Sequence, residues 1–433
     1  VLPGIDKQDT ASGAEFRWID CDNTRFRYGL PEKVGGWSSL VTDTIVGVAR
    51  REFAFVDLDG NRYVAIGTDK FLLIYFEGQL YDITPLKTTL TSATLATTNT
   101  SAICSITTGT NHNLSVGDIV LLDTVTLPVG TGYVDADFEN KLFQVTSITS
   151  ATVFTITQST AATATVGTGG SLSVKPYEQV GPAEQSYGYG WGIDTWSSGK
   201  WGEAASASDV SLEPGLWSLS NFGQVLVATI ANGKTFTWNA GDAARLTTRA
   251  STATSGFETT NNPTATRITL VSPTTRHLIH LGTETTIGDP TTQDDMFIRF
   301  SDQEDINDYV PTAINSAGSQ RLQDGTRIIG ALKAKESILV WTDNALYTMK
   351  FIGAPFTFGF EQVGTNCGLI GKNAAIEIDG MAFWMSSNGF FMFDGTVKSL
   401  PCSVEDYVYD QADTTKGQQV YAGINNLFTE VVW

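Results

Sequence analysis

The chain has 433 residues, enough for two or three domains with large cores, which excludes a small module held together by disulfides. Its 27 basic and 46 acidic residues give a net charge of −19, so its field repels phosphate backbones and argues against a tight, basic nucleic-acid-binding protein. Hydrophobic residues make up 41% and charged residues 17%, which is typical of a folded chain, and no apolar run approaches the roughly 18 residues that span a bilayer.

Both ends of the sequence look internal. Residues 1–4 (Val-Leu-Pro-Gly) contain neither an initiating Met nor a signal pattern, and residues 431–433 (Val-Val-Trp) resemble a strand without a following turn. We therefore expect the natural chain to continue. A source protein with an intact mass of 46.6 kDa would contradict this expectation.

Residues 51–87 predict a meander of four short strands. Apolar residues alternate with polar ones, and turns are expected at 58–61, 68–69 and 77–78. Asp-Gly and related pairs tolerate the positive φ that tight hairpins require. A similar unit at 375–401 has the same order of turns and the same closing proline, which indicates an internal repeat.

Two further meanders, less similar to the first, begin near 217 and 338. Repeated four-stranded meanders of roughly 40 to 50 residues are typical of the blades of a β-propeller. A β-sandwich is the alternative, but a sandwich has no reason to repeat its turn pattern at both ends of the chain. The predicted fold class is therefore all-β, a β-propeller of four-stranded antiparallel blades with an inserted small β domain.

Residues 88–175 differ in composition from both flanks. They are rich in Thr, Ser, Ala and Val, with strand-like runs at 119–122, 142–145 and 152–156. A low-complexity linker is the alternative to a folded insert. The predicted domains are an N-terminal segment with the first blade (1–87), the inserted β domain (88–175) and the remaining blades (176–433), with the last blade cut short.

An aromatic and glycine-rich segment follows the insert. Aromatic residues that alternate with glycine place their rings on one side of an extended segment. Such rings either contact another subunit, an adaptor protein or a glycan, or pin their own loop onto the propeller. The candidate contact residues are Tyr187, Tyr189, Trp191, Trp196 and Trp201.

The cysteines and histidines give little sign of metal or redox chemistry. His277 and His280 are spaced by three, but their surroundings are typical of a strand or loop and do not indicate a metal site. The cysteines lie at least 35 positions apart without a CxxC pair, so we expect them to be reduced and structural. They are Cys21, Cys104, Cys367 and Cys402.

No other pattern predicts catalysis. The acidic segment 301–309 lacks the glycine of an EF-hand loop and predicts a solvated turn. The sequence has no G-x-S-x-G elbow, no P-loop and no H-E-x-x-H helix, and its carboxylates offer no distinguishable glycosidase pair. We therefore expect no enzymatic activity, no catalytic residues, no metal and no cofactor.

The opening residues 3–8 and 18–37 resemble the start of the tail nozzle proteins of short-tailed bacteriophages, the tail tubular protein B family. Residues 112–118 and 143–147 resemble a small β module that is common in phage tail proteins. Further blocks that resemble the nozzle family are 57–60, 65–68, 81–85, 298–305, 394–395 and 400–402.

The resemblance implies a structural virion protein at the distal end of a short tail. It implies a propeller subunit that forms a homo-oligomeric ring, typically of six copies, which contacts the tail adaptor protein and tail fibres and does not span a membrane. Genomic DNA would pass through the ring during ejection without specific binding. An acidic channel wall would avoid retarding the DNA, although acidic residues also serve solubility.

Two alternatives from other functional classes remain open. A glycan-binding or glycan-degrading propeller could act as a tail spike, with Trp191, Trp196 and Trp201 as stacking platforms. A cellular scaffold propeller could bind protein partners instead. Binding to host polysaccharide would favour the first alternative, and a gene outside a block of virion genes would favour the second.

Overall fold

The structure is a computed structural model that describes residues 3–10, 12–39, 41–185, 213–252 and 262–433. The chain forms two compact units. The first consists of Val1–Tyr81, Val180–Arg245 and Thr252–Trp433, and the second of Asp82–Gln179 and Leu246–Ser251. Both units consist mainly of antiparallel strands, which confirms the predicted all-β class.

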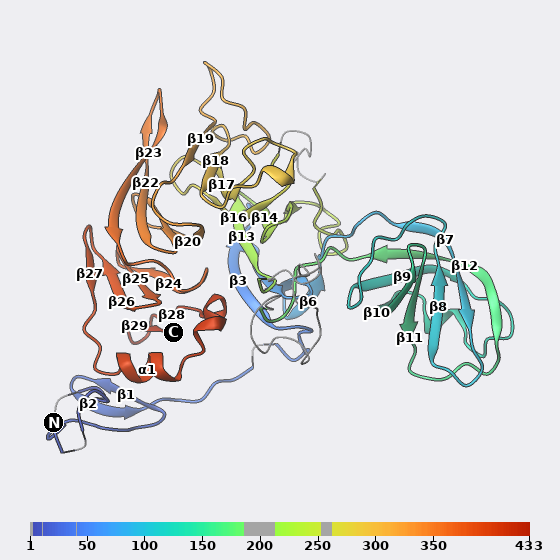
Figure 1. Ribbon diagram of the computed structural model, residues 1–433, viewed down its shortest axis with the longest axis horizontal. Coiled ribbons are helices and arrows are strands. Elements are labelled where there is room, and N and C mark those ends of the chain that lie inside the picture. Colours follow the sequence, from blue (N-terminus) through green and yellow to red (C-terminus); the bar gives the residue numbers. More distant parts are fainter. Residues whose placement is uncertain (1–2, 11, 40, 186–212, 253–261) are drawn as a thin grey trace, which may run out of the picture. The chain divides into compact units, whose positions relative to one another are not determined.

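The first unit contains five antiparallel sheets arranged as the blades of a propeller (Figure 1). The first blade consists of β3 (Ala49–Val56), β4 (Arg62–Thr68), β5 (Leu72–Phe76) and β6 (Gln79–Asp82). The second consists of β13 (Trp217–Phe222), β14 (Val225–Ile230) and β15 (Thr235–Asn239). The third consists of β16 (Thr266–Val271), β17 (Leu278–Thr283), β18 (Phe297–Phe300) and β19 (Gly318–Arg321).

The last two blades follow without interruption. The fourth consists of β20 (Ile328–Lys333), β21 (Ile338–Thr342), β22 (Ala345–Gly353) and β23 (Thr357–Thr365), and the fifth of β24 (Ala375–Ile378), β25 (Met381–Ser386), β26 (Gly389–Phe393) and β27 (Val397–Ser399). Four blades thus have the predicted four strands. The second has three among the described residues, because after β15 the chain turns at 240–245 and then joins the second unit at 246–251.

The turns explain why the hairpins form where the sequence predicts them. Glu77-Gly78 and Asp379-Gly380 have positive φ at both positions, as the tight hairpins between β5 and β6 and between β24 and β25 require. In the turn before β4, the Asp57 carboxylate accepts hydrogen bonds from the backbone amides of Asp59 (2.9 Å) and Asn61 (2.8 Å). Local turn chemistry thus explains hairpins in both of these meanders.

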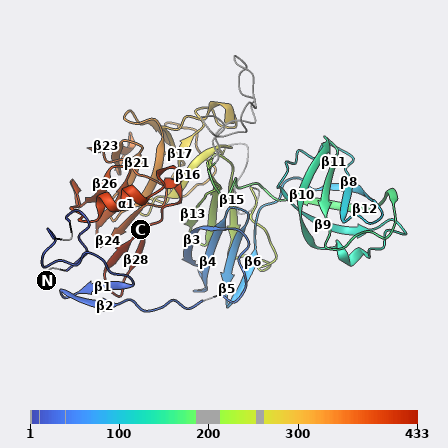
Figure 2. The same ribbon diagram turned by 60° about the horizontal axis from the view of Figure 1, so that its bottom comes forward.

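The innermost strands of the blades lie next to one another in chain order. β3 contacts β13, β13 contacts β16, β16 contacts β20, and β20 contacts β24. Figure 2 shows the first two blades side by side. Large buried rings fill the space between blades: Trp341 of the fourth blade and Trp384 of the fifth meet at 5.4 Å between ring centroids, tilted by 62°.

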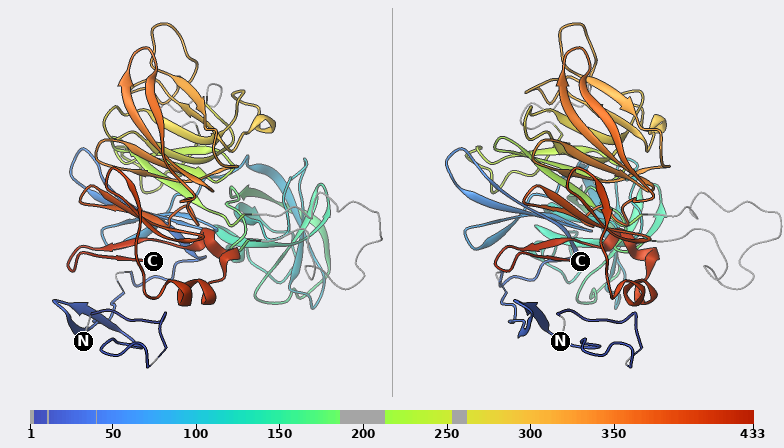
Figure 3. Two further views of the ribbon diagram at one scale, coloured as in Figure 1. Left: turned by 60° about the vertical axis from the view of Figure 1, so that its left-hand side comes forward. Right: turned by 90° about the vertical axis from the view of Figure 1, so that its left-hand side faces the viewer.

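The two ends of the described chain meet on the first unit. The amide of Lys7 donates to the carbonyl of Ser403 (2.9 Å), and the Ser403 hydroxyl donates to the carbonyl of Ile5 (2.6 Å). The guanidinium carbon of Arg25 lies 3.5 Å from the centroid of the Phe428 ring. Figure 3 shows this N-terminal segment beside α1. The elements involved are β1 (Thr24–Arg27), β2 (Leu30–Lys33), α1 (Glu405–Gln411), β28 (Gly423–Asn425) and β29 (Glu430–Val432).

The second unit is a closed barrel of six antiparallel strands in the order β10-β11-β8-β7-β12-β9. Alternating residues such as Leu95, Ile106 and Leu122 fill its core, so the Thr-rich segment is a folded domain rather than a linker. Its strands are β7 (Leu90–Thr97), β8 (Ile103–Thr107), β9 (Ile119–Thr126), β10 (Lys141–Ser150), β11 (Val153–Thr157) and β12 (Val166–Pro176).

Helical structure is sparse in both units. Apart from α1, the residues that the structure describes include the short 3₁₀ turns η1 (Asp135–Asp137), η4 (Pro290–Thr292) and η5 (Thr414–Gln419). In the described part of the chain, none of the helices has the length and apolar character needed to cross a membrane.

Candidate functional site

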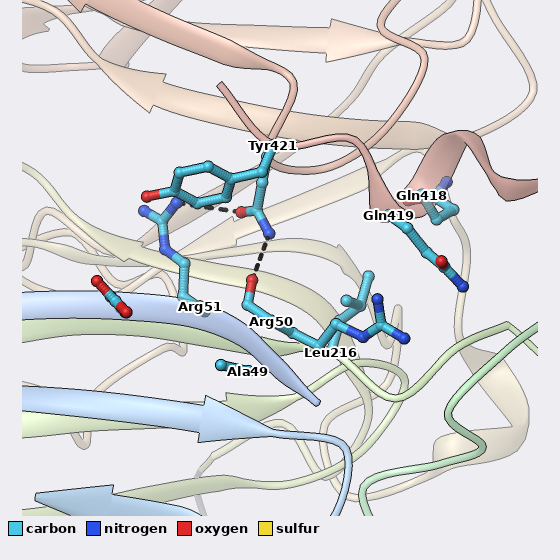
Figure 4. Close-up of a pocket in the computed structure, with 9 residues that line it drawn as sticks. Ala49, Arg50, Arg51, Leu216, Gln418, Gln419 and Tyr421 are labelled. Atoms are coloured by element: carbon cyan, nitrogen blue, oxygen red, sulfur yellow. Dashed lines mark hydrogen bonds between the residues drawn. The ribbon is translucent and has the colours of Figure 1, made fainter. Parts of the chain in front are cut away.

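The innermost strands of the propeller surround a cavity of about 170 Å³, which we call the central cavity. A second hollow of about 210 Å³, the outer cavity, shares two lining residues with it, Arg51 and Asn373 (Figure 4). The polar residues that line the central cavity are Arg51, Ser218, Ser220, Thr269, Lys333, Lys372 and Asn373.

Strand periodicity places these side chains. Residues two apart on a strand share a face, so Arg51 and Phe53 of β3 both line the central cavity, as do Ser218 and Ser220 of β13. Lys333 is the last residue of β20. Every blade therefore supplies lining residues from its innermost strand or from the segment just before it.

Arg51 joins the first blade to the fifth. Its Nη1 donates to Oδ1 of Asn373 (3.1 Å), and Nδ2 of Asn373 donates to the carbonyl of Arg50 (3.1 Å). Figure 4 shows both bonds, with the Tyr421 ring beside the guanidinium of Arg51. Burial lowers the pKa of Arg51, although a guanidinium stays protonated at any physiological pH.

Lys333 approaches the cavity from the fourth blade. Its Nζ donates to Oγ of Ser220 (2.9 Å), which also accepts from the amide of Val271 (3.1 Å). Burial, and to a lesser extent the positive charge of Arg51, lowers the pKa of Lys333 to about 8. This ammonium group has a neutral partner only, and it forms no ion pair among the described residues.

Lys372 approaches from the segment just before β24. Its Nζ is buried and has no hydrogen-bond partner in the described chain. Ser218, which lines the same cavity, has a buried Oγ that likewise lacks a partner among the described residues. Burial lowers the pKa of Lys372 to about 7, with smaller contributions from the positive charges of Arg51 and Arg267; Glu213 opposes the shift.

Two other arginines near the propeller centre are paired with carboxylates. Arg267 donates through Nη2 to both carboxylate oxygens of Glu213 (3.0 and 2.8 Å) and lies 3.4 Å from Asp295. Arg327 donates to the same Glu213 carboxylate. Among the described residues that line the central cavity, the cations without a carboxylate partner are Arg51, Lys333 and Lys372.

The histidines hold structural positions. His280 is buried on β17, with Nε2 3.0 Å from the Tyr309 hydroxyl. His277 precedes β17 and is hydrogen-bonded to the hydroxyls of Thr275 (2.7 Å) and Ser316 (3.0 Å). Within the described ranges no three His, Cys, Asp or Glu side chains are placed to hold a metal ion, and all four cysteines are free thiols.

The acidic segment 301–309 differs from a simple solvated turn. The Asp302 carboxylate accepts from the Ser316 amide (2.7 Å), and Ile306 and Tyr309 are buried under the loop. These apolar anchors fix the loop on the third blade, although Glu304 and Asp305 are exposed and Asp308 is half-buried.

The site residues predicted from the sequence, Tyr187, Tyr189, Trp191, Trp196 and Trp201, lie outside the described residues, so their role stays a prediction. Sequence reasoning missed the cations of the central cavity. One signal could have revealed them: the innermost strand of the repeat, or the segment just before it, carries a basic residue in four blades. These are Arg51, Arg267, Lys333 and Lys372.

Comparisons with known proteins give only remote likenesses. No family model and no curated protein matches the chain. Among solved structures it is similar to a phage phi92 endosialidase, with a TM-score of 0.26, 14% identity, and coverage of 82% of this chain and 55% of that one. It is also similar to the extracellular domain of a hybrid two-component system from B. thetaiotaomicron, with a TM-score of 0.26, 12% identity, and coverage of 83% and 34%. The chain thus spans about half and about a third of these structures.

Proposed function

We propose that this chain is a structural subunit of a bacteriophage tail, which forms a ring around the channel through which the genome leaves. One observation carries the proposal. The blocks 3–8 and 400–402, which both resemble tail nozzle proteins, are separated by almost the whole sequence, yet Nε2 of Gln8 donates to the carbonyl of Cys402 (3.2 Å), and the adjacent Ser403 is hydrogen-bonded to Lys7 and Ile5. Because the two blocks contact each other in the fold, the same contact can account for the resemblance of both blocks to tail nozzle proteins.

Exposed apolar side chains support a role in assembly. The end of β22 and the turn that leads to β23 present Phe351, Ile352 and Phe356, of which Phe356 is 73% exposed. Apolar side chains gathered at one exposed tip are typical of contact surfaces between proteins. This hairpin tip (351–356) is therefore our candidate for contact with a neighbouring subunit.

The charge distribution agrees with passage of DNA without binding. Basic residues that gather in the propeller centre leave the rest of the chain more acidic than the net charge of −19 already indicates. The central cavity, at about 170 Å³, is far too small to admit a duplex. The DNA channel would therefore be the bore of the ring and not the centre of each propeller.

Cryo-electron microscopy of the virion tests this proposal. We expect density for the chain in a ring around the tail axis, with an acidic or neutral bore. Absence of the chain from purified particles, or a peripheral position without a central bore, would overturn the proposal. A monomer in solution would not, since such rings can close only on their adaptor.

A glycan-binding tail spike is the second candidate function. The observation that favours it is the cationic central cavity, which has room for the carboxylate group of an acidic sugar. Saturable binding of the purified chain to host polysaccharide, together with a position at the tail periphery, would favour this candidate over the ring. Release of sugars would add a catalytic role.

A further inference from the structure

We propose that the central cavity binds a small oxyanion, a phosphate or carboxylate group, through Lys372, Lys333 and Arg51. The inference does not depend on the proposed tail role, because it rests on the local chemistry of the cavity alone. It assigns a ligand class to a site for which the sequence offered no motif.

The first argument is the unpaired ammonium of Lys372. A buried charge is stable only when it is paired and hydrogen-bonded, or when it loses its proton. The Lys372 Nζ is buried and has no partner among the described residues, and Lys372 is one of the residues that line a cavity large enough for several water molecules, since one water needs roughly 10–15 Å³. An oxyanion in the cavity would supply both the counter-charge and the acceptor.

The second argument is convergence. Arg51 comes from the first blade, Lys333 from the fourth and Lys372 from the segment before the fifth, and all three line the same cavity. Ser218, from the second blade, adds a hydroxyl that has no partner in the described chain. Charge-assisted hydrogen bonds from several donors to one anion are the usual basis of phosphate and carboxylate recognition.

The third argument is the state of the neighbouring acids. Glu213 is the carboxylate that acts on Lys372, but two arginines, Arg267 and Arg327, already occupy it. Glu52 lines the outer cavity and is exposed, and Tyr421, beside Arg51, carries a phenol and not a carboxylate. The field inside the central cavity therefore favours an anion.

Binding should be accompanied by uptake of protons. Burial is the main cause that lowers the pKa of Lys372 to about 7 and that of Lys333 to about 8. At pH 8 a substantial fraction of both amines is neutral, and an anion stabilises their charged forms. Affinity should therefore fall as the pH rises from 7 to 9.

Isothermal titration calorimetry with inorganic phosphate and with sodium glucuronate, at low ionic strength and pH 7, tests the proposal. We expect one site per chain for at least one of the two anions. Phosphate alone would indicate a phosphate ligand, glucuronate alone an acidic sugar, and both a general oxyanion site. Absence of binding of either anion at millimolar concentration would overturn the proposal.

Variants separate binding in the central cavity from binding elsewhere. Lys372→Met should weaken binding at least tenfold while leaving the melting temperature in anion-free buffer unchanged or higher, because it removes a buried unpaired charge. Lys350→Met, at an exposed position of β22 outside the cavity, should bind as the parent does. Equal binding by Lys372→Met and the parent would refute the site.

Lys333→Met provides a second variant, with the same expected loss of affinity, should Lys372→Met not fold. Titration at pH 8 in two buffers of different ionisation enthalpy should show net proton uptake by the parent and less uptake by either variant. Proton uptake that is equal in all three proteins would place the anion elsewhere.

Discussion

The indole nitrogen of Trp217, the first residue of β13, donates a hydrogen bond of 2.9 Å to the carbonyl oxygen of Thr68, the last residue of β4. The two residues are 149 positions apart, with the whole barrel between them in sequence. The ring of Trp217 also lies directly over Gly67, where a Cβ would come within 2.6 Å of the indole. This contact joins the first two blades.

Gly67→Ala is therefore expected to destabilise the propeller. The added methyl group has no space beneath Trp217, and such overpacking costs about 1–3 kcal/mol of the free energy of unfolding. Chemical denaturation measures the loss. Gly167→Ala is the matched control, since Gly167 also lies in a strand, and a methyl group added there would have no atom within 4 Å. Equal stability of the two variants would contradict the packing argument.

Acid should destabilise the propeller through its buried histidines. Burial lowers the pKa of His277 to about 4 and that of His280 to about 3, against an ordinary value of 6.5. At a pH between these lowered pKa values and 6.5, the histidines bind more protons in the unfolded chain than in the folded one. The free energy of unfolding therefore falls as the pH drops below 6.5. Each histidine contributes a slope of up to about 1.4 kcal/mol per pH unit.

Denaturation of His280→Phe at several pH values between 4 and 6.5 isolates one of these contributions. We expect its stability to fall less steeply with acid than that of the parent, by up to about 1.4 kcal/mol per pH unit. Tyr309→Phe removes the partner of His280 but keeps the titrating ring, so it should shift stability without changing the slope. Parallel curves for His280→Phe and the parent would contradict the assignment.

Glu213→Gln should both destabilise the propeller and strengthen anion binding. It leaves Arg267 and Arg327 without their shared carboxylate, and hydrogen bonds to charged groups are each worth about 1.5–3 kcal/mol. It also removes the negative charge that acts on Lys372. Denaturation and phosphate titration measure the two effects.

Glu304→Gln is the control for that prediction, because its pair with Arg276 lies at the surface with both side chains about half exposed. Its expected cost is below about 1 kcal/mol. A cost as large as that of Glu213→Gln would show that burial does not distinguish the two pairs.

Phe356→Ser should impair assembly without impairing folding. The ring is 73% exposed in the single chain, so its loss should change the free energy of unfolding by no more than about 0.5 kcal/mol. Light scattering and electron microscopy with the adaptor protein present should show fewer closed rings. Val129→Ser, at a position 96% exposed on the barrel, should assemble normally. Rings of Phe356→Ser as abundant as those of the parent would exclude the hairpin tip as a contact.

Local signals explain which parts of the fold were predictable. The hairpins at Glu77-Gly78 and Asp379-Gly380 were, because turn chemistry depends on adjacent residues. The three-stranded form of the second blade among the described residues was not, because it follows from the pairing of 246–251 with a segment more than 150 residues earlier. Closure of the barrel likewise depends on long-range register between strands such as β9 and β12.

The cations of the central cavity were missed for a related reason. Arg51, Lys333 and Lys372 are far apart in sequence, and each alone looks like an ordinary charged residue of a strand or its flank. Only the radial arrangement of the blades brings them together. A comparison of the blades position by position would have shown basic residues recurring near the axis, whereas a search for short motifs could not.

The segment 246–251 determines where the chain can be cut to separate its two units. Arg249 pairs with Asp82 at 2.9 Å and donates to the Tyr177 hydroxyl at 2.7 Å, and the amide of Ala250 donates to the carbonyl of Ile83 at 2.9 Å. Residues 246–251 thus belong to the second unit, although they follow the second blade in the chain. Excising Asp82–Gln179 alone would remove Asp82, Ile83 and Tyr177, the partners of Arg249 and Ala250, so a clean separation also requires the removal of 246–251 and a redesigned connection after Arg245.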